Sequence, residues 1–171
     1  MNSMNNTDRL AMIINEMEGN SRSLATKLLN NPNITITFNP TKPTIDEIKN
    51  ATPGETLVDN SVLVFCNSKF ALIAAPNETE IKSNWYQKEL ICDKLNEHGF
   101  NPDEWFIPTV GQLYLTYVMC KNAFSATYYW SSTEASSTTA CYVNFTSGRQ
   151  GTNSKTNSNC VRAFREVFFD L

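Results

Sequence analysis

The sequence predicts an α+β fold, and three observations lead to this class. Two apolar runs, residues 61–65 and 70–75, are separated by four residues that suit a turn, which is the pattern of a β-hairpin. A segment with apolar residues at helical spacing follows Pro108. Short stretches with strand character then occupy residues 128–131, 140–145 and 160–164. Together these elements are typical of a small α+β domain that begins at Leu57.

Two helices are expected to pack on small antiparallel sheets. The first spans residues 85–97, turns Leu90, Ile91 and Leu95 inward, and ends at His98 and Gly99. The second begins after Pro108, where Thr109 and Gln112 have the spacing of a capping box. Its apolar stripe is expected to be core rather than a cofactor site, and it consists of Val110, Leu113, Tyr114, Tyr117 and Val118.

Residues 1–56 differ from the rest and are interpreted as an N-terminal attachment or oligomerisation arm, followed by a domain at 57–171. Leu10, Ile13, Ile14 and Met17 have helical spacing, residues 24–29 suit a second short helix, and residues 34–38 alternate as in a strand. Thr44 and Glu47 are spaced as a second capping box. Because the arm is too small to bury much surface, we expect it to pack on the domain, on its own copy or on a larger partner.

Composition excludes several functional classes. The net charge is −3 and the cations are scattered, so no basic stripe is present to bind nucleic acid. No apolar run approaches the length of a membrane span, so no membrane insertion is expected. The chain has a single histidine, His98, and five widely spaced cysteines without a C-x-x-C pair, which we interpret as small buried hydrophobes. We therefore expect no catalytic residues, no metal and no cofactor.

Three ordered blocks carry a resemblance to a known family. They are WFIPTVGQL at 105–113, YWSSTE at 129–134 and VRAFR at 161–165, with Phe145, Gly148 and Lys155 between the last two. Over residues 57–168 the chain resembles the bacterial and phage C-type-lectin-like domains. That superfamily includes the variable receptor-binding proteins of diversity-generating retroelements and, more distantly, the formylglycine-generating enzymes. The resemblance implies a C-type-lectin-like fold with long polar loops.

The residues of these blocks are expected to have mainly structural roles. We expect Trp105 and Trp130 to pack in the core rather than stack on a ligand, and Ser131, Ser132 and Thr133 to fix an irregular turn. Glu134 is hypothesised to pair with one of the two arginines of the last block. Lys155 is interpreted as a structural tie, with ligand contact as the alternative. The set of structural motif residues is Trp105, Pro108, Trp130, Glu134, Lys155, Arg162 and Arg165.

The polar loops, residues 135–139 and 146–159, are where the resemblance implies ligand binding. Their tyrosine, serine, threonine and asparagine content suits adaptable hydrogen bonding, although such loops can also be plain solvated connectors. No acidic cluster in them supports calcium-dependent sugar binding. The candidate ligand-binding residues are Ser136, Ser137, Thr138, Tyr142, Asn144, Thr146, Gln150, Asn153, Asn157 and Asn159.

The resulting expectation is a non-enzymatic phage virion surface protein, of the head fibre, tail fibre or capsid decoration type. Its loops would bind a host-surface glycan or protein, and its arm would bind other virion proteins, with a homo-oligomer supplying avidity. The alternative is a purely structural virion component whose lectin-like domain contacts other subunits. A formylglycine-generating type of enzyme is a remote alternative, because the single histidine and the lack of a reactive cysteine pair disfavour it.

Overall fold

Two β-sheets organise the part of the chain that the structure describes. The computed structural model describes residues 40–169, and the compact unit to which they belong begins at Pro40. The first sheet has the strand order β1-β2-β8, with β1 at Val62–Cys66, β2 at Phe70–Ala74 and β8 at Phe164–Phe168. Both of its strand pairs are antiparallel, so the predicted hairpin of β1 and β2 is confirmed.

The second sheet has five strands in the order β3-β7-β4-β5-β6. Its strands are β3 at Ile81–Asn84, β4 at Tyr128–Glu134, β5 at Thr139–Asn144, β6 at Gln150–Ser154 and β7 at Ser158–Val161. The sheet is mixed, because β4 and β7 pair in parallel at Tyr129 and Cys160, which corrects the expectation of purely antiparallel sheets. Strands β3 and β6 were not predicted, and β6 lies inside the segment expected to be a polar loop. The single strand expected at 160–164 is wrong, because that range holds the end of β7 and the start of β8, which belong to different sheets.

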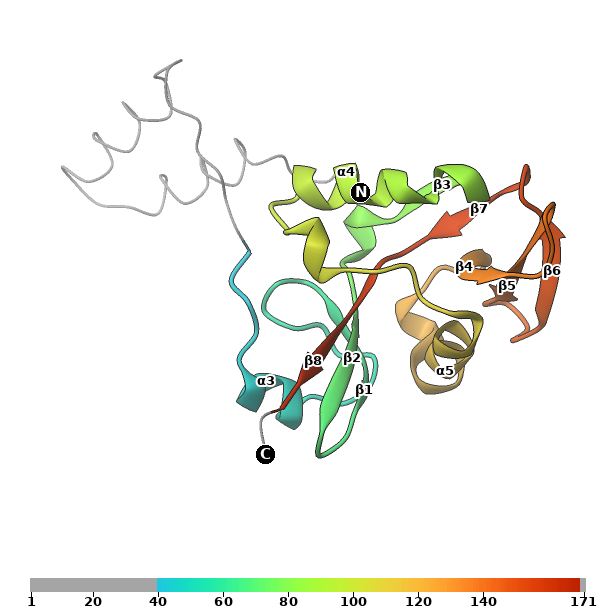
Figure 1. Ribbon diagram of the computed structural model, residues 1–171. Coiled ribbons are helices and arrows are strands. Elements are labelled where there is room, and N and C mark those ends of the chain that lie inside the picture. The colour runs from blue at the N-terminus through green and yellow to red at the C-terminus, as the bar shows by residue number, and fades with distance from the viewer. Residues whose placement is uncertain (1–39, 170–171) are drawn as a thin grey trace, which may run out of the picture. The chain divides into compact units, whose positions relative to one another are not determined.

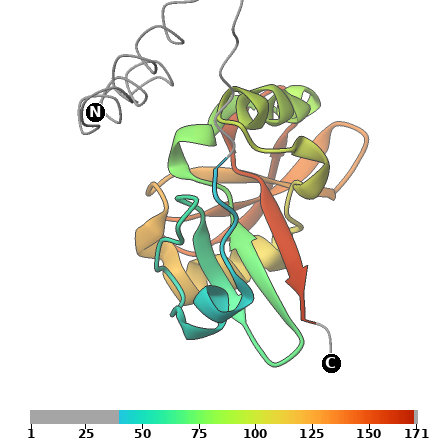
Figure 2. The same ribbon diagram turned by 90° about the vertical axis from the view of Figure 1, so that its left-hand side faces the viewer.

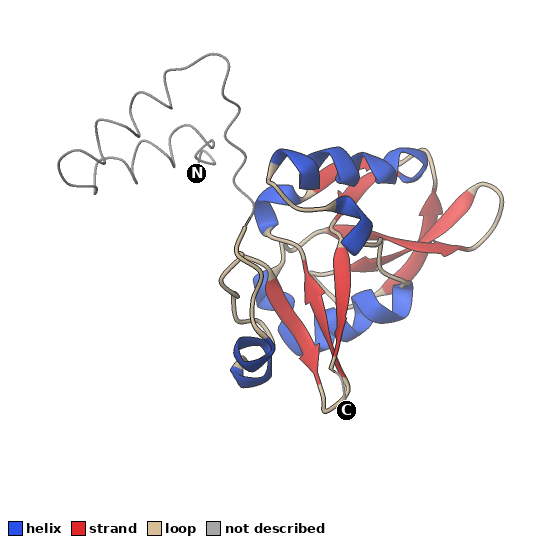
Figure 3. Ribbon diagram, turned by 60° about the vertical axis from the view of Figure 1, so that its left-hand side comes forward, coloured by secondary structure: helices blue, strands red, loops and turns tan. Residues whose placement is uncertain are grey.

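Three α-helices are present in residues 40–169: α3 at Ile45–Asn50, α4 at Ile91–Glu97 and α5 at Val110–Cys120. Four short 3-10 helices accompany them, η1 at Asn77–Thr79, η2 at Trp85–Leu90, η3 at Pro102–Glu104 and η4 at Lys121–Ala123. The segment predicted as one helix over 85–97 is therefore η2 followed by α4. The described residues form an α+β fold, and Figure 3 shows helices on both sides of the strands.

The two sheets separate two apolar cores. One core joins Ile91 and Leu95 of α4 to Trp130 of β4 and Ile73 of β2. The other joins Leu113 of α5 to Tyr129 of β4. It also contains the residues of β2 and β5 that alternate along each strand with those in the first core. Because successive side chains of a strand point to opposite faces, β2 and β4 each contribute to both cores. Figure 1 shows α4 and α5 on opposite sides of the five-stranded sheet.

The capped start of α5 is confirmed, but its predicted core stripe is partly wrong. Thr109 and Gln112 form the capping box in full. Leu113 is 1 % exposed, whereas Tyr114 is 42 % and Val118 is 60 % exposed. The buried face instead continues through Thr116 and Cys120, and the Thr116 hydroxyl donates to the Gln112 carbonyl at 2.7 Å. A small hydroxyl residue that bonds its own helix can thus replace an aliphatic residue in the interior.

The helical segment formed by η2 and α4 agrees with the prediction at its C-terminal end and differs from it before α4 begins. His98 is the C-cap of α4 and Gly99 has a positive φ of 78°. Ile91 and Leu95 are buried as expected, but Leu90 is 50 % exposed because it closes η2 rather than lying within a continuous helix.

Of the five cysteines, all free, Cys120 is buried and the other four are only partly so.

The predicted boundary at residue 56 lies too far along the chain. Helix α3 belongs to the described unit, since Ile48 is 1 % exposed within the first core. Thr44 caps this helix by accepting from the Glu47 amide at 3.1 Å, while the Glu47 carboxylate accepts from the Val58 amide instead of closing a capping box. Figure 2 shows α3 beside the β1–β2 hairpin. The elements expected at 10–17, 24–29 and 34–38 lie outside the described residues.

Candidate functional site

The three sequence blocks that carry the family resemblance meet in space. The Phe106 amide donates to the Phe164 carbonyl at 2.7 Å, and the Phe164 amide donates back to the Phe106 carbonyl at 2.8 Å. The middle block joins the first through the Ser132 amide, which donates to the carbonyl of the buried Pro108 at 2.8 Å. These backbone hydrogen bonds hold together segments that are more than twenty residues apart in the sequence. We call the three joined blocks the frame of the site.

Two buried tryptophans, Trp130 in the middle block and Trp85 at the start of η2, are held by specific hydrogen bonds. Trp130 is 0 % exposed, and its indole N–H donates to the Ser83 carbonyl at 3.2 Å. Trp85 is 7 % exposed and donates to the Ser131 carbonyl at 2.8 Å. A buried indole needs such a partner for its single donor. Both rings therefore have fixed positions, and the core role predicted for Trp130 is confirmed.

Trp105, the remaining tryptophan of the motif set, is also in the core. It is 9 % exposed and meets Phe100 edge to face, with ring centroids 5.5 Å apart. The Arg165 guanidinium lies 4.8 Å from the centre of its ring. Trp105 therefore joins the first core to the last strand, as the core interpretation requires.

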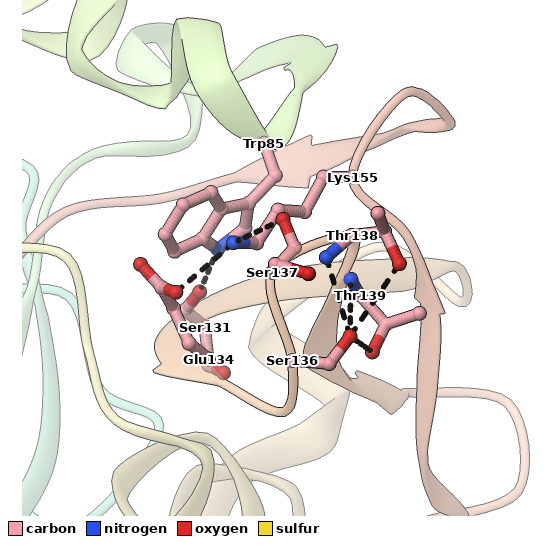
Figure 4. A network of polar contacts seen from close by, with 8 residues as sticks. All are labelled: Trp85, Ser131, Glu134, Ser136, Ser137, Thr138, Thr139 and Lys155. Atoms are coloured by element: carbon pink, nitrogen blue, oxygen red, sulfur yellow. Dashed lines mark hydrogen bonds and ion pairs between the residues drawn. The ribbon is translucent and has the colours of Figure 1, made fainter.

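Lys155 and Glu134 form the polar centre of the candidate site. The Lys155 ammonium donates to Glu134 Oε2 at 3.0 Å and to the Ser137 carbonyl at 3.2 Å, and it lies 4.5 Å from the centre of the Trp85 ring. The Lys155 side chain is 4 % exposed and the Glu134 side chain 57 %. Figure 4 shows these groups converging from β4, the β4–β5 turn and the turn that follows β6. Lys155 thus ties the two polar turns to the frame.

This pairing corrects the hypothesis that Glu134 binds an arginine. Arg165 pairs with Asp59 at 2.7 Å, with side chains 7 % and 1 % exposed. Arg162 donates to the Ala75 carbonyl at 2.6 Å and to the Ala123 carbonyl at 3.0 Å. Both guanidinium groups are buried and bind partners before β4 in the chain, so neither is available to Glu134. Asp59 was missed because an isolated carboxylate before a hairpin gives no sequence signal.

Replacing Glu134 with glutamine is expected to lower the free energy of unfolding by about 1 kcal/mol, because the buried Lys155 ammonium loses a charged partner that is itself largely solvated. The Ser137 carbonyl remains as an acceptor, which limits the loss. Urea unfolding, monitored by tryptophan fluorescence, measures this loss in the free energy of unfolding.

Glu89→Gln is the matched control for this substitution. Glu89 is 69 % exposed and pairs with Lys88 at 3.6 Å, so we expect no measurable change. Equal stabilities of the two variants would contradict the role given to Glu134.

The β4–β5 turn is ordered by its own hydroxyls. Ser136 Oγ accepts from the amides of Thr138 and Thr139 at 3.2 and 3.1 Å, and it lies 2.8 Å from the Thr139 hydroxyl (Figure 4). In β4, Ser131 Oγ donates to the Cys141 carbonyl at 2.8 Å and accepts from the Thr133 amide at 3.2 Å, where the β4–β5 register shifts. Ser136 is therefore engaged in the turn, whereas Ser137 and Thr138 present exposed side chains.

The candidate ligand residues do not share one face. Register pairing places Tyr142 opposite Gly151 and Asn153 opposite Ala140, so Tyr142, Asn144 and Asn153 point to the same side of the sheet. Gln150 pairs with Val143 and points to the other side. Thr146 and Asn157 are exposed in the turns that follow β5 and β6.

Asn159 is not available for ligand contact, which corrects its assignment to the binding face. It is 6 % exposed and lies on β7 opposite Ser83 of β3. The segment 146–159 as a whole is less open than predicted, because β6 and the start of β7 replace most of the expected loop.

Several groups of the second core titrate far from their ordinary range. Burial, and secondarily the charge of Glu80, raises the pKa of the Tyr129 hydroxyl, which donates to Glu80 Oε2 at 2.7 Å. Burial raises the pKa of the Cys120 thiol to about 11 and, with Glu80, that of Cys160 to about 12. These thiols stay protonated at neutral pH, and a protonated thiol is neither a good nucleophile nor a good metal ligand.

Within residues 40–169 no group of three or more histidine, cysteine, aspartate or glutamate side chains has the arrangement of a metal site. None of the helices in the same residues has the length and hydrophobicity needed to cross a membrane. A scan against protein-family models finds no family that matches the chain, and a search of curated proteins finds no similar sequence.

Proposed function

We propose that this chain is a non-enzymatic phage virion surface protein that binds a host-surface glycan or protein through a C-type-lectin-like domain. In this proposal the turns and strands from β4 to β7 carry the ligand surface. The N-terminal residues attach the domain to other virion proteins and support a homo-oligomer. The family resemblance of the three ordered blocks supports the fold and the virion setting, and the backbone bonds that join those blocks are consistent with it.

The observation that carries the binding function is an exposed polar surface on a rigid support. Ser137, Thr138 and Asn157 are exposed, while Tyr142 and Asn153 are partly exposed on the neighbouring strands. Beneath them, the indole hydrogen bonds and the buried Lys155 hold the strands in place. Side chains of hydroxyl, amide and tyrosine type on a preorganised backbone lose little entropy on binding, which favours recognition.

Binding of the full chain to whole bacterial cells tests this proposal. We expect the fluorescently labelled protein to bind some strains of a panel of Gram-negative and Gram-positive bacteria in flow cytometry. Tyr142→Ala is expected to reduce that binding several-fold, and Tyr114→Ala is the control, because Tyr114 is exposed on α5 outside the β4–β7 surface.

Two results would count against the proposal: no strain binds the wild-type chain, or Tyr142→Ala binds as the wild type does. The structural alternative predicts a different pattern. If the β4–β7 surface joins virion subunits, Tyr142→Ala blocks incorporation of the chain into particles, whereas the receptor-binding proposal requires that incorporation continue.

A further inference from the structure

Strand β8 forms one edge of the three-stranded sheet, and part of its backbone points outward. It pairs with β2 along one side, and on the other side the Phe164 amide and carbonyl bond to Phe106. Because hydrogen-bonding direction alternates along a strand, the N–H and C=O groups of Glu166 and Phe168 point to the same outer side. Within residues 40–169 no strand pairs with β8 there, and Figure 2 shows β8 at the outer edge of its sheet.

This edge lacks the features that usually protect an edge strand from pairing with another chain. The register of β8 with β2 runs without a bulge, and β8 contains neither proline nor lysine. Its one exposed charge, Glu166, is held toward α5 by the Gln112 carboxamide, which donates to Glu166 Oε1 at 3.1 Å. The outward backbone groups of Glu166 and Phe168 thus remain open to another strand.

Phe168 ends an aromatic row that crosses the three strands of this sheet. Its ring centroid lies 6.0 Å from that of Phe70 on β2, which lies 5.7 Å from that of Phe65 on β1. Phe168 is 68 % exposed, more than any other large hydrophobic side chain in the described residues. A further strand beside β8 would cover this ring.

The opposite face of the edge carries a groove of about 350 Å³. Its apolar lining comes from Pro43, Ile48 and Val167, and Val167 is only partly buried. Successive side chains of a strand point to opposite faces, so Val167 faces the groove and Phe168 faces the aromatic row. A strand added to β8 would therefore meet an exposed apolar side chain on each face.

We propose that this edge binds the same edge of a second copy of the chain, so that two three-stranded sheets join into one sheet of six strands. Antiparallel pairing about a two-fold axis at Val167 puts Glu166 of each copy opposite Phe168 of the other. These are the two residues with outward backbone groups, so the pairing satisfies the N–H and C=O groups of both residues in both copies. The inference goes beyond the proposed function, which assigns oligomerisation to the N-terminal residues.

The start of β8 has an excess of negative charge. The groove is lined by two cations and two carboxylates, and two of these groups are in ion pairs that neutralise the cations: Lys42 with Glu104 at 2.6 Å, and Arg165 with Asp59 at 2.7 Å. Glu166 is in no ion pair within the described residues. Its carboxylate is therefore the uncompensated charge at this end.

The other end of β8 is bordered by two exposed cations. The Lys69 carbonyl accepts from the Phe169 amide at 2.8 Å, and the Lys49 ammonium lies 4.7 Å from the centre of the Phe169 ring. Lys49 is in the last turn of α3, whereas the acidic residues of that helix, Asp46 and Glu47, are in its first turn. Antiparallel pairing brings the acidic end of one copy to the basic end of the other, which favours a second copy over an unrelated strand.

Cysteine cross-linking tests the position of the two-fold axis. Residues opposite each other in a non-hydrogen-bonded antiparallel pair have Cα atoms about 4.5 Å apart, which is within disulfide range. We expect Val167→Cys in the full chain to form a covalent dimer under mild oxidation, visible on a non-reducing gel and lost on reduction. The controls are the wild type, with its five free cysteines, and Lys82→Cys, exposed on the edge strand β3 of the other sheet.

Phe168→Asp tests the strength of the same contact in sedimentation velocity. The substitution removes the exposed ring and places a second carboxylate opposite Glu166 of the other copy, so we expect the dissociation constant of the dimer to rise at least about tenfold. An unchanged circular dichroism spectrum verifies the fold. Tyr86→Asp is the matched control, because Tyr86 is 58 % exposed on η2 away from this edge, and it should leave the dissociation constant unchanged.

The outcomes separate this inference from the proposed function. More cross-linked dimer for Val167→Cys than for both controls, together with a weaker dimer for Phe168→Asp, is the supporting result. If the wild type is monomeric at about 100 µM, or if either variant behaves as its control does, the inference is wrong. An oligomer that survives both changes lies elsewhere on the chain, and binding of a monomeric chain to cells leaves the receptor-binding proposal intact.

Discussion

Replacing Asp59 with asparagine is expected to lower the free energy of unfolding by about 3–5 kcal/mol, the cost of leaving a buried charge without its partner. Asp59 Oδ2 accepts from Arg165 Nη2 at 2.7 Å, and the two side chains are 1 % and 7 % exposed. Asparagine keeps the shape and an oxygen for the Ser61 amide, so the main loss is the negative charge. Urea unfolding of the full chain, followed by tryptophan fluorescence, measures the change.

A double-mutant cycle tests the physical reason for this loss. Arg165→Met removes the cation, so the double variant Asp59→Asn with Arg165→Met no longer buries an unpaired charge. We expect the double variant to be less destabilised than the sum of the two single variants. Glu97→Gln, in the exposed pair with Lys94, serves as the surface control and should produce no measurable change. Additive losses in the cycle would contradict the pairing.

Arg162→Met is expected to destabilise the protein by a similar amount, about 3–5 kcal/mol, although Arg162 has no carboxylate in direct contact. Its guanidinium donates to the carbonyls of Ala75 and Ala123 and to Asn77 Oδ1, and it stacks on the Phe124 ring at 4.2 Å. Burial lowers the pKa of this group below its usual range, with carboxylate charges such as Glu80 opposing the shift. Removal leaves the buried Ala75 carbonyl, the partly buried Ala123 carbonyl and Asn77 Oδ1 without this donor.

Two further variants make the Arg162 prediction specific. Arg162→Lys keeps the charge but lacks the planar fork, so it is expected to recover less than half of the loss. Arg149→Met removes an exposed arginine from the β5–β6 turn and should leave the unfolding midpoint unchanged. A stability loss in Arg162→Met no greater than that in Arg149→Met would show that the carbonyls find other donors, and the structural role assigned here would be wrong.

Part of the candidate site follows from local sequence and part does not. The Thr109–Gln112 capping box and the β1–β2 hairpin depend on residues a few positions apart, so both can be recognised in the sequence. The partner of Glu134 cannot be predicted from the sequence, because the sequence does not distinguish among three later cations, Lys155, Arg162 and Arg165. Strand register and burial select Lys155.

Strand β6 illustrates the same limit. Its sequence, Gln-Gly-Thr-Asn-Ser, has the composition of a loop, yet it forms a strand because its backbone pairs with β5 along five residues. That pairing lays Tyr142 over Gly151, while the pairing of β7 with β3 places the buried Asn159 opposite Ser83. The faces presented by the candidate ligand residues were therefore decided by pairing with other strands, not by the residues themselves.

By itself, the sequence determined the α+β class, the N-caps of α3 and α5, the β1–β2 hairpin and the tryptophan core, because each depends on short-range spacing or on the hydrophobicity of single residues. Only the tertiary structure decided which side of α5 is buried, which acceptors each buried cation binds, and which polar residues remain exposed. Those outcomes depend on contacts such as Asp59 with Arg165, 106 positions apart, where the energy comes from burial and geometry that no local pattern encodes.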